Sequence, residues 1–207
     1  DTLRINDKEL IYDETDAIYV ATATLDAYQT GTFAPRLHFV SKVSDAEYEM
    51  RIDGVAPNDE GVVTLENFDC SIPHTLNLYK NGVEIENAPI RFTYLNLVEV
   101  NYPSCNGSYY TPGTIRVTQA NVAGYDSIYT AAYRYRGATA QGFEKKSYAV
   151  KLYEKDGVTS KDVEFLGLRD DNNWILDAMA VDKACMRNRV STDLWNDFAT
   201  PPYHKAA

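Results

Sequence analysis

The sequence predicts a mostly β, α+β protein in which an antiparallel β-sandwich is followed by a smaller antiparallel sheet with one helix. Short β-prone segments recur at regular intervals, tyrosine is abundant, and one clear helical period occurs late in the chain. The 207 residues include 16 tyrosines, and aromatic residues make up 12% of the chain. This composition favours strands and half-buried sheet faces. The length allows one large domain or two small ones.

Residues 1–95 contain β-prone segments separated by turn signals, with no helical window of useful length. Asn81-Gly82 between two of these segments is a strong signal for a type I′ hairpin. Strands spaced this regularly are typical of a small antiparallel β-sandwich, here an Ig-like accessory domain. The segments expected to form strands are 17–25, 36–41, 46–52, 61–65, 75–80, 83–85 and 89–95.

Residues 96–207 have a different pattern, and we place the domain boundary near residues 95–97. A loop over 101–113 is rich in Asn, Pro, Ser, Tyr and Gly, and 173–180 is apolar and fits a strand or a helix by periodicity alone. The segments expected to form strands here are 114–119, 128–136 and 146–153.

The clearest helix is expected from Lys183 to Phe198. Asp182 is a suitable N-cap, and Pro201-Pro202 ends the helical pattern. The apolar residues recur every four positions, as one face of a helix requires. They are Met186, Val190, Leu194 and Phe198.

Charge and composition exclude several functions. The chain has 20 basic and 30 acidic residues, a net charge of −10, and no basic stripe, so we expect no nucleic-acid partner, because phosphate binding needs clustered Lys and Arg. No apolar run approaches the ~18 residues that cross a bilayer. The three cysteines and three histidines are scattered and form no CxxC, which argues against structural zinc. We expect buried or half-buried thiols, with one disulfide still possible.

The strand–loop–strand segment 134–153 is the one place where the residues suggest chemistry. A loop with two glycines can bring backbone N–H groups close to phosphate oxygens, while lysines on the return strand supply charge. Alternation puts Ala149 and Lys151 on one face, where an adenine ring could lie over the alanine while the lysine reaches the phosphates. An ordinary hairpin with solvated lysines is the alternative. The basic residues concerned are Arg134, Arg136, Lys145, Lys146 and Lys151.

Other motifs fail on spacing. The acidic run 169–173 lacks the Gly and Glu that an EF-hand needs at its sixth and twelfth positions, which are Ile175 and Val181 here. Asp177 and Asp182 are poor metal candidates without a third convergent carboxylate. No nucleophile elbow, His-Glu-x-x-His or Walker loop occurs.

Several segments of the second half follow one another in a characteristic order, namely 135–139, 145–152, 165–168, 173–176 and 186–195 with Asp182. Together they resemble the spore coat protein H (CotH) family of atypical secreted kinases over residues 96–207. The resemblance implies that the loop after Arg136 serves as a glycine-rich loop and that Lys151, with Lys146 second, contacts phosphate. The implied nucleotide-binding residues are Arg136, Gly137, Thr139, Gly142, Lys146 and Lys151.

The family pattern also departs from this sequence. A kinase helix offers Glu to the strand lysine, but this helix has none, and its polar residues Asn188, Asp193 and Asp197 remain open as partners. The family's second lobe, with its catalytic and metal-binding acids, is expected beyond Ala207. No catalytic or metal residue is therefore assigned, and we expect an inactive fragment consisting of an accessory domain and part of the N-lobe.

The resemblance implies ATP and Mg²⁺ as cofactors of the full-length protein and a protein or surface acceptor for the phosphate. It also implies a secreted or cell-surface location, with no transmembrane segment in this chain. An incomplete lobe exposes edges and apolar faces, so we expect self-association through residues 96–207. The alternative is a non-catalytic surface-binding or adhesion module that uses the β-sandwich.

Overall fold

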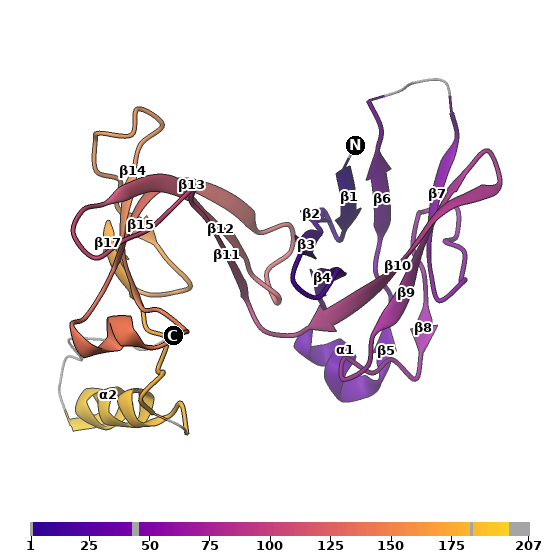
Figure 1. Cartoon of the computed structure of the whole chain (residues 1–207). Helices are drawn as coiled ribbons and strands as arrows, with labels where there is room; N and C mark the ends of the chain where they lie inside the picture. The colour runs from indigo at the N-terminus through magenta and orange to yellow at the C-terminus, as the bar shows by residue number, and fades with distance from the viewer. Residues whose placement is uncertain (1, 43–45, 183, 199–207) are drawn as a thin grey trace. The chain divides into compact units, whose positions relative to one another are not determined.

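A computed structural model describes residues 2–42, 46–182 and 184–198 (Figure 1). This part of the chain is mostly β, with several antiparallel sheets and two α-helices, which confirms the predicted fold class. The chain divides into two compact units, Asp1–Glu99 with Val117–Ser127 and Val100–Arg116 with Ile128–Ala207. The predicted domain boundary near residues 95–97 stays a prediction.

Three sheets build the first unit, with strand orders β3-β4-β10-β9-β7, β2-β1-β6 and β5-β8. The pairs are antiparallel except β4–β10, which is parallel. A parallel pair needs a crossover connection rather than a tight turn, and local turn signals do not reveal one. The strands are β1 (Thr2–Ile5), β2 (Lys8–Glu9), β3 (Ile11–Asp13), β4 (Ile18–Thr22), β5 (Thr32–Phe33), β6 (Leu37–Val40), β7 (Tyr48–Ile52), β8 (Leu65–Glu66), β9 (His74–Lys80) and β10 (Val83–Thr93).

The hairpin between β9 and β10 forms where the sequence predicts it. Asn81 and Gly82 have φ angles of 50° and 77°, and a type I′ turn needs positive φ at both central residues. The segments 83–85 and 89–95, expected to be separate strands, form one continuous strand, β10. A register shift between Glu84 and Glu86 explains the difference, because a bulge breaks the alternation without ending the strand.

Aromatic and branched side chains form the core of the first unit. The rings of Phe33, Phe68 and Phe92 have centroids 4.8–5.4 Å apart, and Ile52 and Ile90 are fully buried. Burying each such side chain stabilises the fold by roughly 1.5–3 kcal/mol. These residues come from several strands and loops, so the core joins segments that are distant in the sequence.

The first unit also contains a helix that the sequence reading misses, α1 (Leu25–Thr30). Thr24 caps its start by accepting a hydrogen bond from Ala27 N at 3.1 Å, and Gly31 ends it with a φ of 71°. Leu25 therefore begins a helix rather than ending a strand. A helix of six residues is too short to show a hydrophobic period, but its N-cap and C-terminal glycine are visible in the sequence.

Lys8 holds the turn between β12 and β13 within the first unit. Its side chain is buried, and Nζ donates hydrogen bonds to the carbonyl oxygens of Gln119 and Ala120 and to Thr22 Oγ1. Burial lowers the pKa of Lys8, while the charge of Asp126 opposes that shift. A buried ammonium with several acceptors fixes the turn because each lost contact leaves a polar group unsatisfied.

A second five-stranded sheet has the order β11-β12-β13-β14-β17. The sequence of residues 173–180 fits either a strand or a helix, and the first four of them form a strand, β17. The last residues of the expected loop 101–113 belong to β12. The elements are β11 (Leu97–Asn101), β12 (Thr111–Thr118), β13 (Asp126–Tyr135), the 3₁₀ turn η1 (Thr139–Gly142), β14 (Tyr148–Tyr153), β15 (Val163–Glu164), β16 (Asp170–Asp171) and β17 (Asn173–Leu176); β15 pairs with β16.

One face of this sheet forms a core around Tyr133. Tyr133, Val150 and Leu152 are at most 1% exposed, and the Tyr133 hydroxyl donates to the carbonyl oxygen of Thr114 at 2.7 Å. Alternate residues of β13 and β14 therefore face the opposite side of the sheet, as the period of a strand requires. The opposite face carries the basic residues described below.

The C-terminal helix is α2 (Arg187–Phe198). The Asp182 carboxylate accepts hydrogen bonds from the backbone N–H groups of Met186 and Arg187 at 3.0 and 2.6 Å. The helix nevertheless begins later than predicted, because Ala184, Cys185 and Met186 are not helical, so Asp182 contacts the first turn from a preceding loop and is not the N-cap residue. The expected starting residue Lys183 and the expected terminator Pro201-Pro202 lie outside the described residues. The apolar residues expected on one face are exposed, including Phe198 at 84%.

Neither described helix is long and apolar enough to cross a bilayer. Cys70 and Cys105 are half-buried free thiols, as expected. Cys185 is also free, but it is exposed, which corrects the expectation of three buried or half-buried thiols. It lies in the exposed turn between Asp182 and α2, where Cys185 N donates to the Asp182 carbonyl oxygen.

Candidate functional site

Strand register brings two cations and two small residues to one face of the second sheet. Arg134 of β13 lies opposite Ala149 of β14, and Ala132 lies opposite Lys151. Directly opposed residues of an antiparallel pair point to the same face. We call Ala132, Arg134, Ala149 and Lys151 the basic face. The arrangement agrees with the expectation that Ala149 and Lys151 share one face.

Tyr110 lies against both cations of the basic face. Lys151 Nζ is 4.8 Å and Arg134 Cζ is 5.1 Å from the centroid of the Tyr110 ring. Such cation–π contacts stabilise by about 0.5–1 kcal/mol at accessible positions. Tyr110 directly precedes β12, which neighbours β13 in the sheet. The two cationic groups therefore share this ring as a neighbour.

Arg134 has an unsatisfied donor. Its Nε is buried and has no hydrogen-bond partner among the described residues. A buried donor without an acceptor costs about 1–3 kcal/mol. The basic face thus contains a buried polar group whose capacity to donate a hydrogen bond is unused among the described residues.

The loop expected to cradle phosphate is closed by its own hydrogen bonds. Gly137 has a φ of 84°, which favours glycine, and Gln141 Nε2 donates to the Gly137 carbonyl oxygen. Lys146 Nζ donates to the carbonyl oxygens of Gln141, at 2.7 Å, and Phe143. The Lys146 ammonium therefore fixes the conformation of the loop. Thr139 and Gly142, the ends of η1, are both exposed.

Asp177, which follows β17, connects the strand pair to α2. Ser147 Oγ and Asn188 Nδ2 donate to its carboxylate at 3.1 and 2.8 Å, and Met179 N donates at 3.0 Å. The pKa of Asp177 is lowered, first by the hydrogen bond from Met179. The hydrogen bonds from Ser147 and Asn188 and the charge of Arg136 lower it further. The exposed Arg136 thus lies in the field of an ionised carboxylate.

The helix residues left open as partners of the strand lysine have other partners. Asn188 donates to Asp177, as above, and Asp193 accepts from Arg189 Nε at 2.8 Å. Asp197 is exposed. The structure therefore links α2 to the sheet through Asn188 and Asp177, not through a bond to Lys151.

Sequence reasoning missed Tyr110 and did not select Arg134 or Asp177. Arg134 appears in the basic cluster of the sequence, but nothing there distinguishes it from Arg136. Tyr110 is remote in sequence from both cations, so no local pattern identifies it. Ser147 is buried and contacts Asp177, but a single serine in the sequence is only weak evidence for that contact. No group of three or more His, Cys, Asp and Glu side chains gathers as a metal site among the residues that the structure describes.

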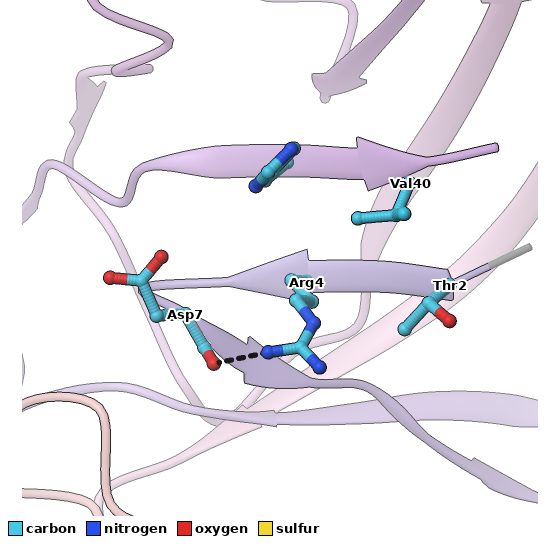
Figure 2. Close-up of a pocket in the computed structure, with 5 residues that line it drawn as sticks. Thr2, Arg4, Asp7 and Val40 are labelled. Carbon is cyan, nitrogen blue, oxygen red and sulfur yellow. Dashed lines mark hydrogen bonds between the residues drawn. The ribbon is translucent and has the colours of Figure 1, made fainter. Parts of the chain in front are cut away.

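The first unit has an open pocket of about 310 Å³ on the β1–β6 sheet (Figure 2). Cross-strand register places Arg4 opposite His38 and Thr2 opposite Val40. Arg4 Nη1 donates to the carbonyl oxygen of Asp7 at 3.2 Å, as the dashed line in Figure 2 shows. The pocket has a polar, ionisable lining and belongs to a different unit from the basic face.

Comparison with known proteins assigns the segment that carries the basic face. Residues 133–206 match the family model described as CotH kinase protein. This segment is similar to the CotH kinase family. No curated protein and no solved structure gives a significant match to the chain.

The CotH match begins within β13 and continues through η1, β14 and β17 to α2. It includes Arg134, Lys151 and the loop between Arg136 and Lys146, whereas Tyr110 precedes it. The similarity to the CotH kinase family suggests nucleotide use. The six residues that the sequence assigns to nucleotide binding stay predictions.

Proposed function

We propose that this chain provides the nucleotide-contacting sheet of a CotH-type kinase that transfers phosphate from ATP to a protein or surface acceptor. The observation that carries the proposal is the placement of Lys151 beside the small residue Ala149 on the basic face, within the segment that matches the family. A small side chain leaves room for a flat ring over the sheet, while the lysine reaches the phosphates.

The basic face fits a phosphate-bearing ligand. Arg134 and Lys151 supply positive charge in a chain whose net charge is −10, and Arg134 Nε is buried without an acceptor. When bound, ATP would supply the phosphoryl group that is transferred. We propose Mg²⁺ as its companion ion and assign no metal ligand to this chain.

The loop residues have separate roles in this proposal. Lys151 contacts the phosphates, and the backbone of the loop from Gly137 to Gly142 approaches them, with Arg136 and Thr139 at its edges. Lys146 acts by holding the loop closed through its hydrogen bonds to loop carbonyl oxygens. Removing the Lys146 side chain should therefore loosen the loop rather than remove a direct phosphate contact.

Binding of ATP by the 207-residue chain tests this proposal. We expect Lys151→Ala to weaken ATP binding by at least about tenfold, because a charge-assisted contact is lost. Lys155→Ala removes an exposed lysine of the neighbouring loop and should leave the affinity unchanged. Equal affinities of the Lys151→Ala and Lys155→Ala variants would reject the assignment.

We expect nucleotide binding without phosphate transfer, because we assign no catalytic acid in this chain and transfer requires positioned charge. A radiolabelled-ATP assay with a generic protein acceptor tests this expectation. ATP-dependent labelling by the chain alone would contradict it.

We also propose that the protein acts outside the cell or at its surface, and that this chain self-associates through residues 96–207. Exposed apolar side chains on α2 support self-association, including Leu194 at 50% and Phe198 at 84%, since large exposed apolar surfaces favour contacts. Small-angle scattering over a concentration series tests it, and a monomeric profile at the highest concentration would contradict it.

A surface-binding or adhesion module is the second candidate function. The pocket of about 310 Å³ near Arg4 and His38 favours it, because convergent polar groups in a concavity are typical of ligand sites. A glycan or peptide screen with the Arg4→Ala variant as control distinguishes the candidates. Binding that depends on Arg4 but not on Lys151 would favour the adhesion function.

A further inference from the structure

We infer that Arg134 is an anion-binding residue that forms, with Lys151, a two-cation site for the phosphate chain of a nucleotide, and that Tyr110 holds the two cations together. The inference adds a ligand residue that the sequence does not select. Its nucleotide identity rests on the proposed function, whereas its anion chemistry rests on the geometry of the basic face alone.

The first argument is the position of the two cations. Arg134 and Lys151 lie on adjacent strands and on one face, and both contact the ring of Tyr110, at 5.1 and 4.8 Å. Two like charges held near each other raise the local positive potential and repel one another. An anion bound between them would relieve that repulsion.

The second argument is the missing partner. Among the residues that the structure describes, neither Arg134 nor Lys151 has a carboxylate in contact. Both cations lie against the aromatic ring of Tyr110 instead. Acidic residues are not scarce, since the chain has 30 of them. Other arginines do find carboxylates, for example Arg51 with Glu49 and Arg189 with Asp193.

The third argument is the buried Nε of Arg134. This N–H has no acceptor among the described residues, and a buried donor without an acceptor destabilises the protein. Guanidinium groups present several N–H donors in a planar fork that matches phosphate oxygens. A phosphate oxygen would therefore recover the free energy that the unpaired donor costs.

The neighbouring cations Lys146 and Arg136 have other polar or charged neighbours. Lys146 is already bonded to loop carbonyl oxygens, and Arg136 lies near the ionised Asp177. Arg134 and Lys151 are set apart from these two cations by their shared contact with the Tyr110 ring.

Calorimetric titration of the 207-residue chain with tripolyphosphate and with ATP tests the inference. We expect Arg134→Gln to lower the affinity for both probes by about tenfold or more. Arg134→Lys keeps the charge but not the fork, so it should recover only part of the affinity. Lys155→Gln is the matched control and should bind both probes as the wild type does.

Thermal unfolding without ligand gives a second readout. Arg134→Gln removes an unsatisfied buried donor and also a cation–π contact, whose effects on stability oppose each other. The variant should therefore melt no lower than the wild type while losing affinity for the anion. Wild-type tripolyphosphate affinity in a folded Arg134→Gln variant, or no tripolyphosphate binding by the wild type, would overturn the inference.

One further variant separates this inference from the proposed function. Ala149→Leu fills the space above the strand and should weaken ATP binding while leaving tripolyphosphate binding unchanged. If tripolyphosphate binding depends on Arg134 but Ala149→Leu has no effect on ATP, the anion site stands and the adenine-binding proposal fails.

Discussion

Lys8→Met tests how a buried ammonium fastens the β12–β13 turn within the first unit. The Lys8 side chain is buried, and Nζ donates to the carbonyl oxygens of Gln119 and Ala120 and to Thr22 Oγ1. Methionine keeps the apolar stem but offers no donor. The substitution therefore removes the hydrogen bonds while preserving most of the packing.

The expected cost follows from two opposing effects. Hydrogen bonds to a charged group contribute about 1.5–3 kcal/mol each, and the two carbonyl oxygens lose this donor. Removing the ammonium also removes its cost of burial, which offsets part of the loss. We expect the free energy of unfolding to fall by about 2–4 kcal/mol.

Urea unfolding at neutral pH measures this change, and Lys155→Met is the control. Lys155 is exposed, so its substitution should stay within about 0.5 kcal/mol of the wild type. Amide hydrogen exchange should report faster opening of residues 117–127 in Lys8→Met. A variant with the wild-type urea midpoint and unchanged exchange in that turn would refute the reasoning.

The pH dependence of the free energy of unfolding, compared between the wild type and Lys8→Met, gives a second and independent test. Burial lowers the pKa of Lys8 below 10.5, so the unfolded chain binds this proton more tightly than the folded chain. Between the two pKa values, this group makes the free energy of unfolding rise with pH. The difference in stability between wild type and Lys8→Met should therefore grow in favour of the wild type as the pH approaches 10.5. A difference independent of pH in that window would contradict the direction of the shift.

Three further changes have defined outcomes. Hydrogen bonds from Met179 and others lower the pKa of Asp177, so the wild type should lose stability as the pH falls below 3.8. Asp177→Asn should lose less stability over the same pH range, and acid titration followed by circular dichroism measures the difference. Burial and the hydrogen bond with Tyr148 raise the pKa of Tyr102 above 10.0, so stability should fall as the pH rises through 10, and less so in Tyr102→Phe; urea midpoints at pH 9 and 11 decide this. Gly82→Val should cost about 1–2 kcal/mol in urea unfolding, because φ is 77°, and an unchanged midpoint would exclude the left-handed turn.

Local patterns in the sequence predict much of the fold. Asn81-Gly82 predicts the β9–β10 turn because the left-handed conformation depends on the turn residues themselves. The four-residue apolar period predicts that α2 exists, but not that it begins as late as Arg187. The parallel pairing of β4 with β10 could not be predicted, since the register between strands far apart in sequence is set by tertiary packing. The helix α1 could be predicted only in part. Thr24 and Gly31 mark its two ends in the sequence, but six residues are too few to show a helical period of apolar residues.

The candidate site shows the same division. Ala149 and Lys151 are two residues apart on one strand, so alternation predicts their common face. Tyr110 approaches Lys151 from the loop that precedes β12, and Asp177, which follows β17, contacts Asn188 of α2. Such contacts depend on the order of strands in the sheet, which a single sequence does not contain.

The basic cluster of the hairpin shows why counting charges cannot locate a binding site. In sequence, Lys146 and Lys151 are both lysines near a glycine-containing loop, and both are predicted to contact phosphate, with Lys151 first. In the structure, the Lys146 ammonium is bonded to carbonyl oxygens of its own loop, whereas Lys151 and Arg134 share only the face of an aromatic ring. A cation bonded to carbonyl oxygens must break those bonds to reach a ligand, but a cation held by a ring exchanges a weaker contact for a stronger one. Anion affinity should therefore depend on Arg134 and Lys151 more than on Lys146, although all three contribute equally to the net charge.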